Sequence, residues 1–469
     1  VLELLSALVE QSLVAAETDA DGTIRYRMLE PIRQFASHRA EQTGEAVELS
    51  ARHFEWALAF AQSAGSKLRG ADQHEWLDRL EIEHDNLRAA LSWSQQAEAT
   101  SSDELQLAAS LWRFWETRGH ISEGRRWLDD ALSRSGYAPT GLRAQGLNAA
   151  GNLARDQGDN TRATELHQAS LAIRRELGDE YGQAQSLTNL GNLMLDHGNY
   201  ERATQLYSEA MSFFREHGED WDIANALNNL GIAFGYLGDY EQATVALEEA
   251  LRLREAIGET ASRARSLDAL GVVMHMRGDS VRARYLHEAS LALRRELGDK
   301  RGIAIALNNL GVVARSSGDL NRARQLSDES LQLRREIGDR FGIAMSLASL
   351  ADVARDSGDL PEAIQLYKEA MTLHRQIEIN EGIVDSLLGI SVVLAARGEH
   401  QRAAHFMAAS DRLREEMNLR LPPANRSEYE AVVARIQDAL GDVAYAEARE
   451  RGSTLSIDQA VDEALMVSD

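Results

Sequence analysis

The sequence repeats itself every forty residues over most of its length, and this period constrains the fold more than any other feature. One column of the repeat is always glycine: Gly158, Gly198, Gly238, Gly278, Gly318, Gly358 and Gly398. A second column is always alanine: Ala163, Ala203, Ala243, Ala283, Ala323, Ala363 and Ala403. A period between about 20 and 50 residues is typical of solenoids, in which each unit packs only on its neighbours.

Each unit predicts two helices with a short break between them. In the second unit, apolar and small residues recur at helical spacing on both sides of the break: Leu187, Leu190, Gly191 and Met194 before it, and Ala203, Leu206, Tyr207, Ala210, Met211 and Phe214 after it. Gly198 in the break suits the left-handed residue that ends a helix, and Gly178-Asp179 supplies a helix end followed by an N-cap. Gly191 lies inside a helix, where glycine costs roughly 1 kcal/mol, and this indicates close packing between the two helices.

The Leu-Gly pair of the first helix, the glycine at the turn, and the alanines flanking Leu or an aromatic residue on the second helix resemble the tetratricopeptide repeat. The resemblance covers residues 140–419 as seven units, each longer than the usual length of about 34 residues. It implies an all-α fold, a right-handed superhelix of helical hairpins. Residues 104–139 resemble a degenerate earlier unit, in which Trp112, Trp115 and Trp127 are expected to pack a cap.

Residues 1–44 do not follow the period. They predict a helix, two short strands about the turn at residues 19–22, and a second helix at 30–42, which is the order of the tail of a winged-helix fold. Seven acidic residues against four arginines make this segment a poor DNA-binding surface, so we expect a packing module. Residues 45–103 are expected to form a helical linker or cap, and residues 420–469 a C-terminal helical cap begun by a capping box at Ser456 and Gln459.

Two stretches extend the resemblance beyond the repeats. Residues 12–45, followed by 75–93, resemble the junction between the nucleotide-binding and repeat regions of bacterial STAND ATPases, including LuxR-like and antibiotic-regulator-like transcriptional regulators. Residues 421–465 are similar to the ending of the same group. This implies an upstream NTPase domain in the same polypeptide, with the repeats acting as its sensor. The chain has no Gly-Lys dipeptide and hence no Walker A loop, and its start at Val1 in an apolar pattern indicates a fragment.

Charge and composition exclude several classes of function. With 50 basic and 74 acidic residues the net charge is −24, which disfavours direct contact with nucleic acid. The absence of cysteine excludes disulfides and thiolate sites and favours a cytoplasmic location, and no apolar run reaches the roughly eighteen residues that span a membrane. None of the thirteen histidines has metal-site spacing, and no nucleophile elbow occurs, so we expect no metal, no cofactor and no catalysis.

Binding is therefore expected on the first helix of each unit, whose exposed side, by the resemblance, faces a concave groove. The residues that this places in the groove are Gln145, Asn148, Asn152, Arg155, Gln185, Asn192, Asn225, Asn228, Tyr236, Arg265, His275, Asn308, Arg315 and Arg355. Amide side chains both donate to and accept from a peptide backbone. The alternative is an ordinary solvated polar face. Arg155, Arg315 and Arg355 share one column and would suit an acidic ligand.

The sequence thus predicts the sensor region of a STAND-type regulator, which binds a peptide or protein partner in its groove and controls the upstream NTPase. A stand-alone peptide receptor and a passive scaffold remain as alternatives. Arginines near the ends of the second helices, such as Arg174, Arg294 and Arg334, are expected to balance the helix dipole.

Overall fold

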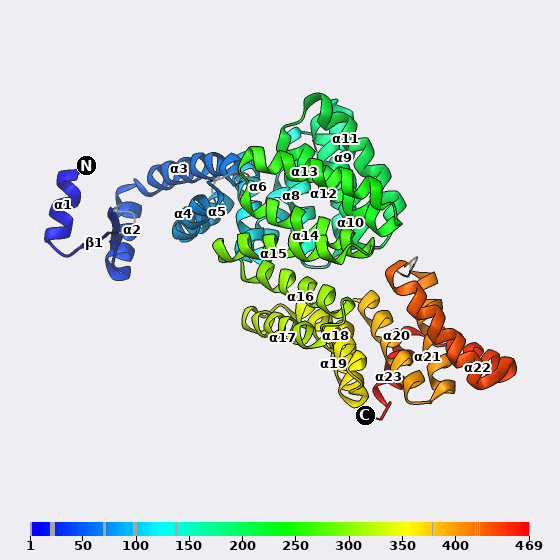
Figure 1. Ribbon diagram of the computed structural model, residues 1–469. Coiled ribbons are helices and arrows are strands. Elements are labelled where there is room, and N and C mark those ends of the chain that lie inside the picture. The colour runs from blue at the N-terminus through cyan, green and yellow to red at the C-terminus, as the bar shows by residue number, and fades with distance from the viewer. Residues whose placement is uncertain are drawn as a thin grey trace. The chain divides into compact units, whose positions relative to one another are not determined.

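The computed structural model describes residues 2–18, 24–68, 72–96, 101–136, 138–377, 379–417, 419, 421 and 423–468. Within these residues the chain forms 23 helices and one two-stranded sheet, which confirms the predicted all-helical class (Figure 1). Among the described helices, none combines the length and apolar character needed to cross a membrane. By their contacts the helices divide into two compact units, α1 to α7 with most of α8, and α9 to α23.

The N-terminal segment is a helix, a hairpin and a helix, as predicted: α1 (Leu2–Glu10), β1 (Val14–Thr18), β2 (Ile24–Met28) and α2 (Glu30–Thr43). The strands are antiparallel, with Val14 opposite Met28 and Thr18 opposite Ile24. The predicted turn at residues 19–22 lies outside the described residues. Helix α2 buries none of its side chains, and Phe35 on it is 71% exposed. An apolar surface of this segment is therefore left uncovered by the chain itself.

Five helices complete the first unit before the regular repeats: α3 (Ala46–Lys67), α4 (Gln73–Ile82), α5 (His84–Gln96), α6 (Ser101–Arg118) and α7 (Ile121–Arg134). Helices α6 and α7 form the degenerate hairpin. Trp115 and Trp127 are 1% and 5% exposed, and a Cβ added at Gly124 would lie 2.5 Å from the Trp115 ring. These two tryptophans pack the core of the hairpin, which is the role that the sequence favoured over ligand binding.

Seven helix pairs follow at the predicted forty-residue period. The first helices are α8 (Gly141–Asp156), α10 (Glu180–Asp196), α12 (Asp220–Leu237), α14 (Thr260–Met276), α16 (Lys300–Ser316), α18 (Arg340–Asp356) and α20 (Asn380–Ala396). The second helices are α9 (Asn160–Leu177), α11 (Tyr200–His217), α13 (Tyr240–Ile257), α15 (Ser280–Glu296), α17 (Leu320–Ile337), α19 (Leu360–Gln376) and α21 (His400–Glu416). In the second unit, each helix packs on the next as an antiparallel neighbour (Figure 1).

Local chemistry sets the ends of these helices. The glycine column has positive φ at all seven positions, for example 81° at Gly158 and 69° at Gly198, so the glycines end the first helices in the left-handed conformation. The side chain that follows caps the next helix: Asp159 accepts from the backbone N–H of Arg162, and Asn199 from that of Arg202. These caps satisfy N–H groups that the first turn of a helix leaves without partners.

Close packing explains the glycine within the first helices. A Cβ added at Gly191 would lie 2.6 Å from Cε1 of Tyr207, a fully buried ring on the partner helix. At the equivalent Gly231, an added Cβ would lie 2.6 Å from Cγ of Leu247. Ala203, near Tyr207 on α11, is 0% exposed. The helices therefore approach to a distance that leaves no room for a side chain.

Buried arginines join one hairpin to the next. Arg174 is 4% exposed and donates to the carbonyl oxygen of Gly182, in the first turn of the following helix, and Arg334 donates in the same way to Gly342. A Cβ at Gly182 would meet the Arg174 guanidinium at 2.6 Å, so glycine makes room for it. These side chains fix the joint between repeats, which is more than the dipole compensation that the sequence predicted.

Two helices close the chain, α22 (Pro423–Ser453), which is kinked at Gly441, and α23 (Ile457–Leu465). The capping box predicted at Ser456 is present, since the Ser456 hydroxyl accepts from the Gln459 N–H and the Gln459 side chain accepts from the Ser456 N–H. Helix α23 packs on α19, α20 and α21 and covers the end of the last repeat.

Candidate functional site

The second unit encloses a cavity of about 450 Å³ on the inner side of its repeats. Helices α11, α12, α16, α18, α19, α20, α21 and α22 all contribute to its lining. Its apolar and aromatic lining consists of Tyr200, Tyr236, Phe341, Met345, Tyr367, Leu388, Val392, Leu419 and Tyr429. Leu419 also lies against the turn at Gly198, where an added Cβ would be 2.9 Å from it. Residues about 220 positions apart in sequence therefore meet around one cavity.

Two stacked tyrosines form one wall of the cavity. The rings of Tyr200 and Tyr236 lie 4.6 Å apart between centroids and are inclined by only 5°. Tyr200 is 7% exposed, while Tyr236 is 41% exposed and so keeps part of its ring open to the cavity. A stacked pair of this kind presents a flat apolar surface with negative charge density on its face.

A network of ion pairs forms a second wall. Arg315 lies 2.8 Å from Asp356 and 3.5 Å from Asp352. Arg355 lies 2.8 Å from Asp356 and 3.2 Å from Glu428. Burial opposes the charge of both arginines, but Asp352 and Asp356 hold the pKa of each guanidinium above its usual value. Both cations are thus neutralised within the protein.

This network corrects one expectation from the sequence. The sequence suggests that the arginine column suits an acidic ligand. In the structure, the Arg315 and Arg355 side chains are only 19% and 11% exposed, and each is paired with two or more carboxylates. An acidic ligand would have to displace these carboxylates from the arginines. This is unfavourable, because it breaks ion pairs that are largely shielded from water and leaves the displaced carboxylates without partners. The pairing could not be read from the forty-residue period, because its acidic members do not recur in every unit.

Two carboxylates on α20 form the third wall. Asp385 accepts a hydrogen bond from Arg414, whereas Glu381 has no ion pair within the described part of the chain. Burial, followed by the charge of Asp385, raises the pKa of Glu381, and burial raises that of Asp385 in spite of Arg414. Both residues are nevertheless exposed, and 58% of the Asp385 side chain is in contact with solvent, so they line an open hollow rather than a sealed core.

His374 completes the lining from α19. Its side chain is 3% exposed, and its Nδ1 atom has no hydrogen-bond partner. Burial lowers the pKa of this imidazole to about 4, so the ring is neutral at physiological pH. A neutral ring with a free nitrogen can accept a hydrogen bond or, in the other tautomer, donate one.

The structure brings three of the predicted groove residues together in this cavity: Tyr236, Arg315 and Arg355. Three others, Asn148, Asn228 and Asn308, are 9%, 7% and 4% exposed and lie between helices. The carbonyl oxygen of the Asn228 side chain accepts from the Ser266 hydroxyl of the next repeat at 2.8 Å. Asn228 thus contributes to the contact between repeats, and contact of the three asparagines with a ligand remains a prediction.

The remaining predicted residues lie outside the cavity lining. Gln145 and Arg265 are exposed, while Asn152, Arg155, Gln185, Asn192, Asn225 and His275 are partly exposed. Asn192 is the best connected of these, since its side-chain oxygen accepts from the Tyr207 hydroxyl and from the Asn229 amide, both at 2.8 Å. The amide row therefore forms bonds along the repeats as well as presenting polar atoms.

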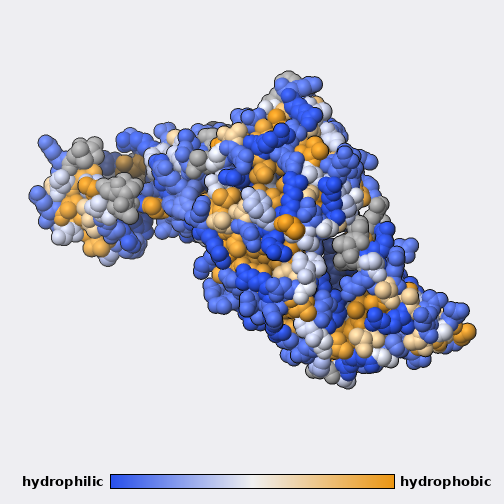
Figure 2. All heavy atoms as spheres, viewed as in Figure 1, coloured by the Kyte–Doolittle hydropathy of each residue, from blue (hydrophilic) through white to orange (hydrophobic). Residues whose placement is uncertain are grey.

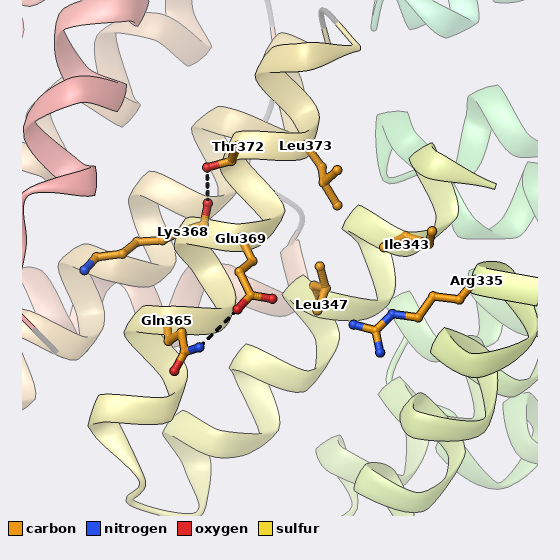
Figure 3. A pocket seen from close by; sticks show the side chains of 8 residues that line it. All are labelled: Arg335, Ile343, Leu347, Gln365, Lys368, Glu369, Thr372 and Leu373. Atoms are coloured by element: carbon orange, nitrogen blue, oxygen red, sulfur yellow. Dashed lines mark hydrogen bonds between the residues drawn. The ribbon is translucent and has the colours of Figure 1, made fainter. Parts of the chain in front are cut away.

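A second hollow, of about 580 Å³, is lined by α17, α18 and α19, and Figure 3 shows the side chains that line it. Its apolar floor consists of Ile343, Leu347 and Leu373. Gln365 donates to Glu369 at 3.1 Å, and Lys368 points away from the hollow in Figure 3 and donates to the carbonyl oxygen of Val467. Its polar groups are engaged with one another. Figure 2 shows hydrophilic side chains over much of the visible face, interrupted by hydrophobic patches.

One group in the first unit has the composition of a metal site. Glu81, His84 and His120 each offer a ligand atom, and these atoms lie within 4.8 Å of one another. His120 is 3.2 Å from Glu81, and Glu123 beside His84 accepts two hydrogen bonds from Arg88. Glu81 also lies 3.9 Å from Arg118, and Glu123 lies 2.5 Å from Arg88, so each of these carboxylates has an arginine partner.

Comparison with known proteins places the repeats in a family. A family model described as tetratricopeptide repeat matches residues 142–216, 222–296 and 302–376. These segments are tetratricopeptide repeats. The matches cover the first six of the seven predicted units, and repeats of this kind are typical of protein–protein interaction.

Curated relatives from Mycobacterium tuberculosis and Mycobacterium bovis carry the provisional name of HTH-type transcriptional regulators. They are 35% identical over 187 residues, which is 38% of this chain and 21% of each relative. The match thus spans about a fifth of the length of these relatives.

Two solved structures share the fold. A Rap protein complexed with Competence and Sporulation Factor has a TM-score of 0.61 and 14% identity, covering 78% of this chain and 99% of that chain. A Signal Transduction ATPase with Numerous Domains, with a tetratricopeptide repeat sensor, from Pyrococcus horikoshii has a TM-score of 0.54 and 12% identity. It covers 92% of this chain and 60% of that chain. At these identities the likeness is one of fold.

Sequence reasoning missed Tyr200, His374, Glu381 and Asp385. Tyr200 and His374 lie on second helices, which were not considered, and the two carboxylates have no counterpart in neighbouring units. The buried arginines of the joints did leave a signal, since Arg174 and Gly182, Arg294 and Gly302, and Arg334 and Gly342 are each eight residues apart.

Proposed function

We propose that this chain is the sensing and protein-interaction region of a STAND-type signalling NTPase. It binds a peptide or protein partner on the inner side of its repeats, and binding changes the activity of an NTPase domain in the same polypeptide. The observation that carries this proposal is the cavity of about 450 Å³, which joins the second and third repeats to the last two and to α22. A ligand held there touches several repeats at once.

The mechanism follows from the repeat architecture. Each hairpin packs only on its neighbours, so small changes at successive joints add into a large change of curvature. A ligand that contacts both α12 and α20 selects one curvature because it binds best where its two sets of contacts are correctly spaced. The chain's own contribution is therefore to convert occupancy of the cavity into a displacement of its ends.

The N-terminal segment supports the second half of the proposal. Leu4, Ile24, Leu29 and Phe35 are 71%, 55%, 57% and 71% exposed. Exposed apolar residues gathered in one small segment mark a surface that another protein surface covers. In our proposal this surface packs on the NTPase domain. The Pyrococcus horikoshii protein, which shares the fold, is likewise named as an ATPase with a tetratricopeptide repeat sensor.

The test is nucleotide hydrolysis by the complete regulator. We expect the rate to change when residues 140–469 are removed, and to change again when they are added in trans. An unchanged rate in both experiments contradicts the proposal. A stand-alone peptide receptor is the second candidate, favoured by the likeness of fold to a Rap protein solved in complex with Competence and Sporulation Factor. Peptide binding without any effect on hydrolysis would support it.

A further inference from the structure

The three walls of the cavity have complementary chemistry for one kind of group. We propose that the cavity binds the cationic side chain of a Lys or Arg residue in a linear peptide, held between the stacked Tyr200 and Tyr236 and the carboxylates of Glu381 and Asp385. The inference rests on the proposed function, because it names the chemistry of the ligand that the groove would take.

The charge of the lining is the first argument. Four carboxylates, Asp352, Glu381, Asp385 and Glu428, face three arginines, Arg315, Arg355 and Arg414, so the lining has an excess of one negative charge. Asp356, which pairs with both Arg315 and Arg355, raises the excess to two. Glu381 is the carboxylate without an ion pair among the described residues, so the excess charge is located on α20. A cation from a ligand would balance it.

The position of the tyrosines is the second argument. Tyr200, Tyr236, Glu381 and Asp385 all line the same cavity. After burial, the charges of the two carboxylates are among the causes that raise the pKa of both tyrosines, which agrees with this placement. A cation between these groups meets an aromatic face on one side and carboxylates on the other. Such contacts contribute more where water is partly excluded, as in this hollow.

His374 is an independent indication of a ligand. It lines the same cavity, is 3% exposed, and leaves Nδ1 without a partner. Buried polar atoms in folded proteins almost always have a hydrogen-bond partner, and the exceptions call for an explanation. A peptide amide placed in the cavity would supply the missing partner to this neutral ring.

A peptide fits better than a small free amine, because apolar side chains adjoin the cation site. Phe341 and Met345 line the cavity and are 44% and 40% exposed. An apolar residue next to the Lys or Arg would cover them. A free polyamine would leave them in water. The net charge of −24 on the whole chain also raises the rate at which a basic peptide arrives.

The experiment uses the complete chain and four pools of acetylated and amidated heptapeptides. The central residue is fixed as Lys, Arg, norleucine or Glu, and all other positions are mixed. Fluorescence anisotropy then gives the affinity of the best Lys peptide and of its norleucine analogue. We expect the Lys and Arg pools to bind and the norleucine analogue to bind at least ten-fold more weakly.

Variants locate the site. We expect the double variant Glu381→Gln with Asp385→Asn, and separately Tyr236→Ala, to weaken binding of the Lys peptide at least ten-fold. Glu288→Gln, an exposed change on the second helix α15, is the matched control and should leave the affinity unchanged. Circular dichroism confirms that each variant is folded; Tyr236 is partly exposed, so its removal leaves the core intact.

Several results would overturn the inference. They are preferential binding of the Glu or norleucine pool, an unchanged affinity in both groove variants, no binding of any pool, or equal binding of N-acetyl-lysine amide, which would make the ligand a free amine. These outcomes are distinct from failure of the proposed function. If groove variants alter hydrolysis by the complete regulator but Lys peptides do not bind, the sensor proposal stands and the ligand chemistry is wrong.

Discussion

Replacing His374 with phenylalanine should make α19 and α20 more stable than in the wild type at pH 5, and about equally stable at pH 7. His374 is almost completely buried, with Nδ1 unpaired, so a non-titrating ring of similar shape loses no hydrogen bond at that atom. The repeat supplies its own precedent, because the same column holds Phe214, four repeats earlier, which is 2% exposed.

The magnitude follows from the pKa. Burial lowers the pKa of His374 from its ordinary value of 6.5 to about 4. In the unfolded chain the ring gains its proton as the pH falls through 6.5, whereas in the folded chain it stays neutral until about pH 4. Stability contributed by the neutral ring is therefore complete above pH 6.5 and is lost as the pH falls towards 4. At pH 5 the loss is about 2 kcal/mol, out of about 3 kcal/mol for the whole shift.

Hydrogen exchange of peptides from α19 and α20 is the appropriate assay, because repeat arrays open in parts and a single melting temperature averages over them. The quantity to measure is the opening free energy of the variant minus that of the wild type, at pH 7 and at pH 5. Burial also lowers the pKa of His53, His84 and His275, but these are present in both proteins and cancel. An identical difference at both pH values would refute the reasoning.

Three further predictions concern packing, capping and charge. Gly191→Ala should lower the free energy of unfolding by about 1–3 kcal/mol, because the added Cβ would lie 2.6 Å from the Tyr207 ring. Gly65→Ala, where no atom lies within 4 Å of the added Cβ, should raise it by about 0.5–1 kcal/mol. Urea denaturation measures both changes. Ser456→Ala should cost α23 about 1 kcal/mol, seen as faster hydrogen exchange there, and unchanged exchange would contradict the capping role. Glu381→Gln should raise the Tm at pH 7 but not at pH 4, because the raised pKa means that the ionised carboxylate disfavours the fold; a lower Tm at pH 7 would show that Glu381 has a stabilising partner.

The forty-residue period was enough to predict the helix pairs, their ends and the tight crossing at Gly191. These features depend on residues close in sequence, such as Gly158 and Asp159, whose backbone preferences act locally. The cap at Ser456 was predictable for the same reason. Local signals of this kind need no knowledge of how distant repeats are arranged.

The composition of the cavity could not be predicted in the same way. Its walls combine Tyr200 with Glu381 and Asp385, which come together only once the curvature of several joints has accumulated. Asn228 is a second example. The sequence shows a polar residue on a helix, but it does not show that the side-chain oxygen of Asn228 accepts a hydrogen bond from the Ser266 hydroxyl of the next repeat. The ion pairs of the arginine column escaped prediction because they join separate elements: Arg315 pairs with Asp356 one repeat further on, and Arg355 pairs with Glu428 on α22 as well as with Asp356 beside it.

The joints of the array are not equally stiff. In one column of the repeat, Arg174, Arg254 and Arg334 each donate to a backbone carbonyl oxygen of the following helix. The same column holds Phe214 before α12 and His374 before α20. At these two joints, among the contacts described, no side chain of this column bonds to the backbone of the next helix, although Asn229 of α12 still donates to Asn192 of α10. We therefore expect these two joints to bend more readily than the others, as hinges of the array. Tyr236 extends from one hinged helix and Glu381 from the other. A ligand bridging them would lock both hinges together, and occupancy would be transmitted as stiffness along the whole array.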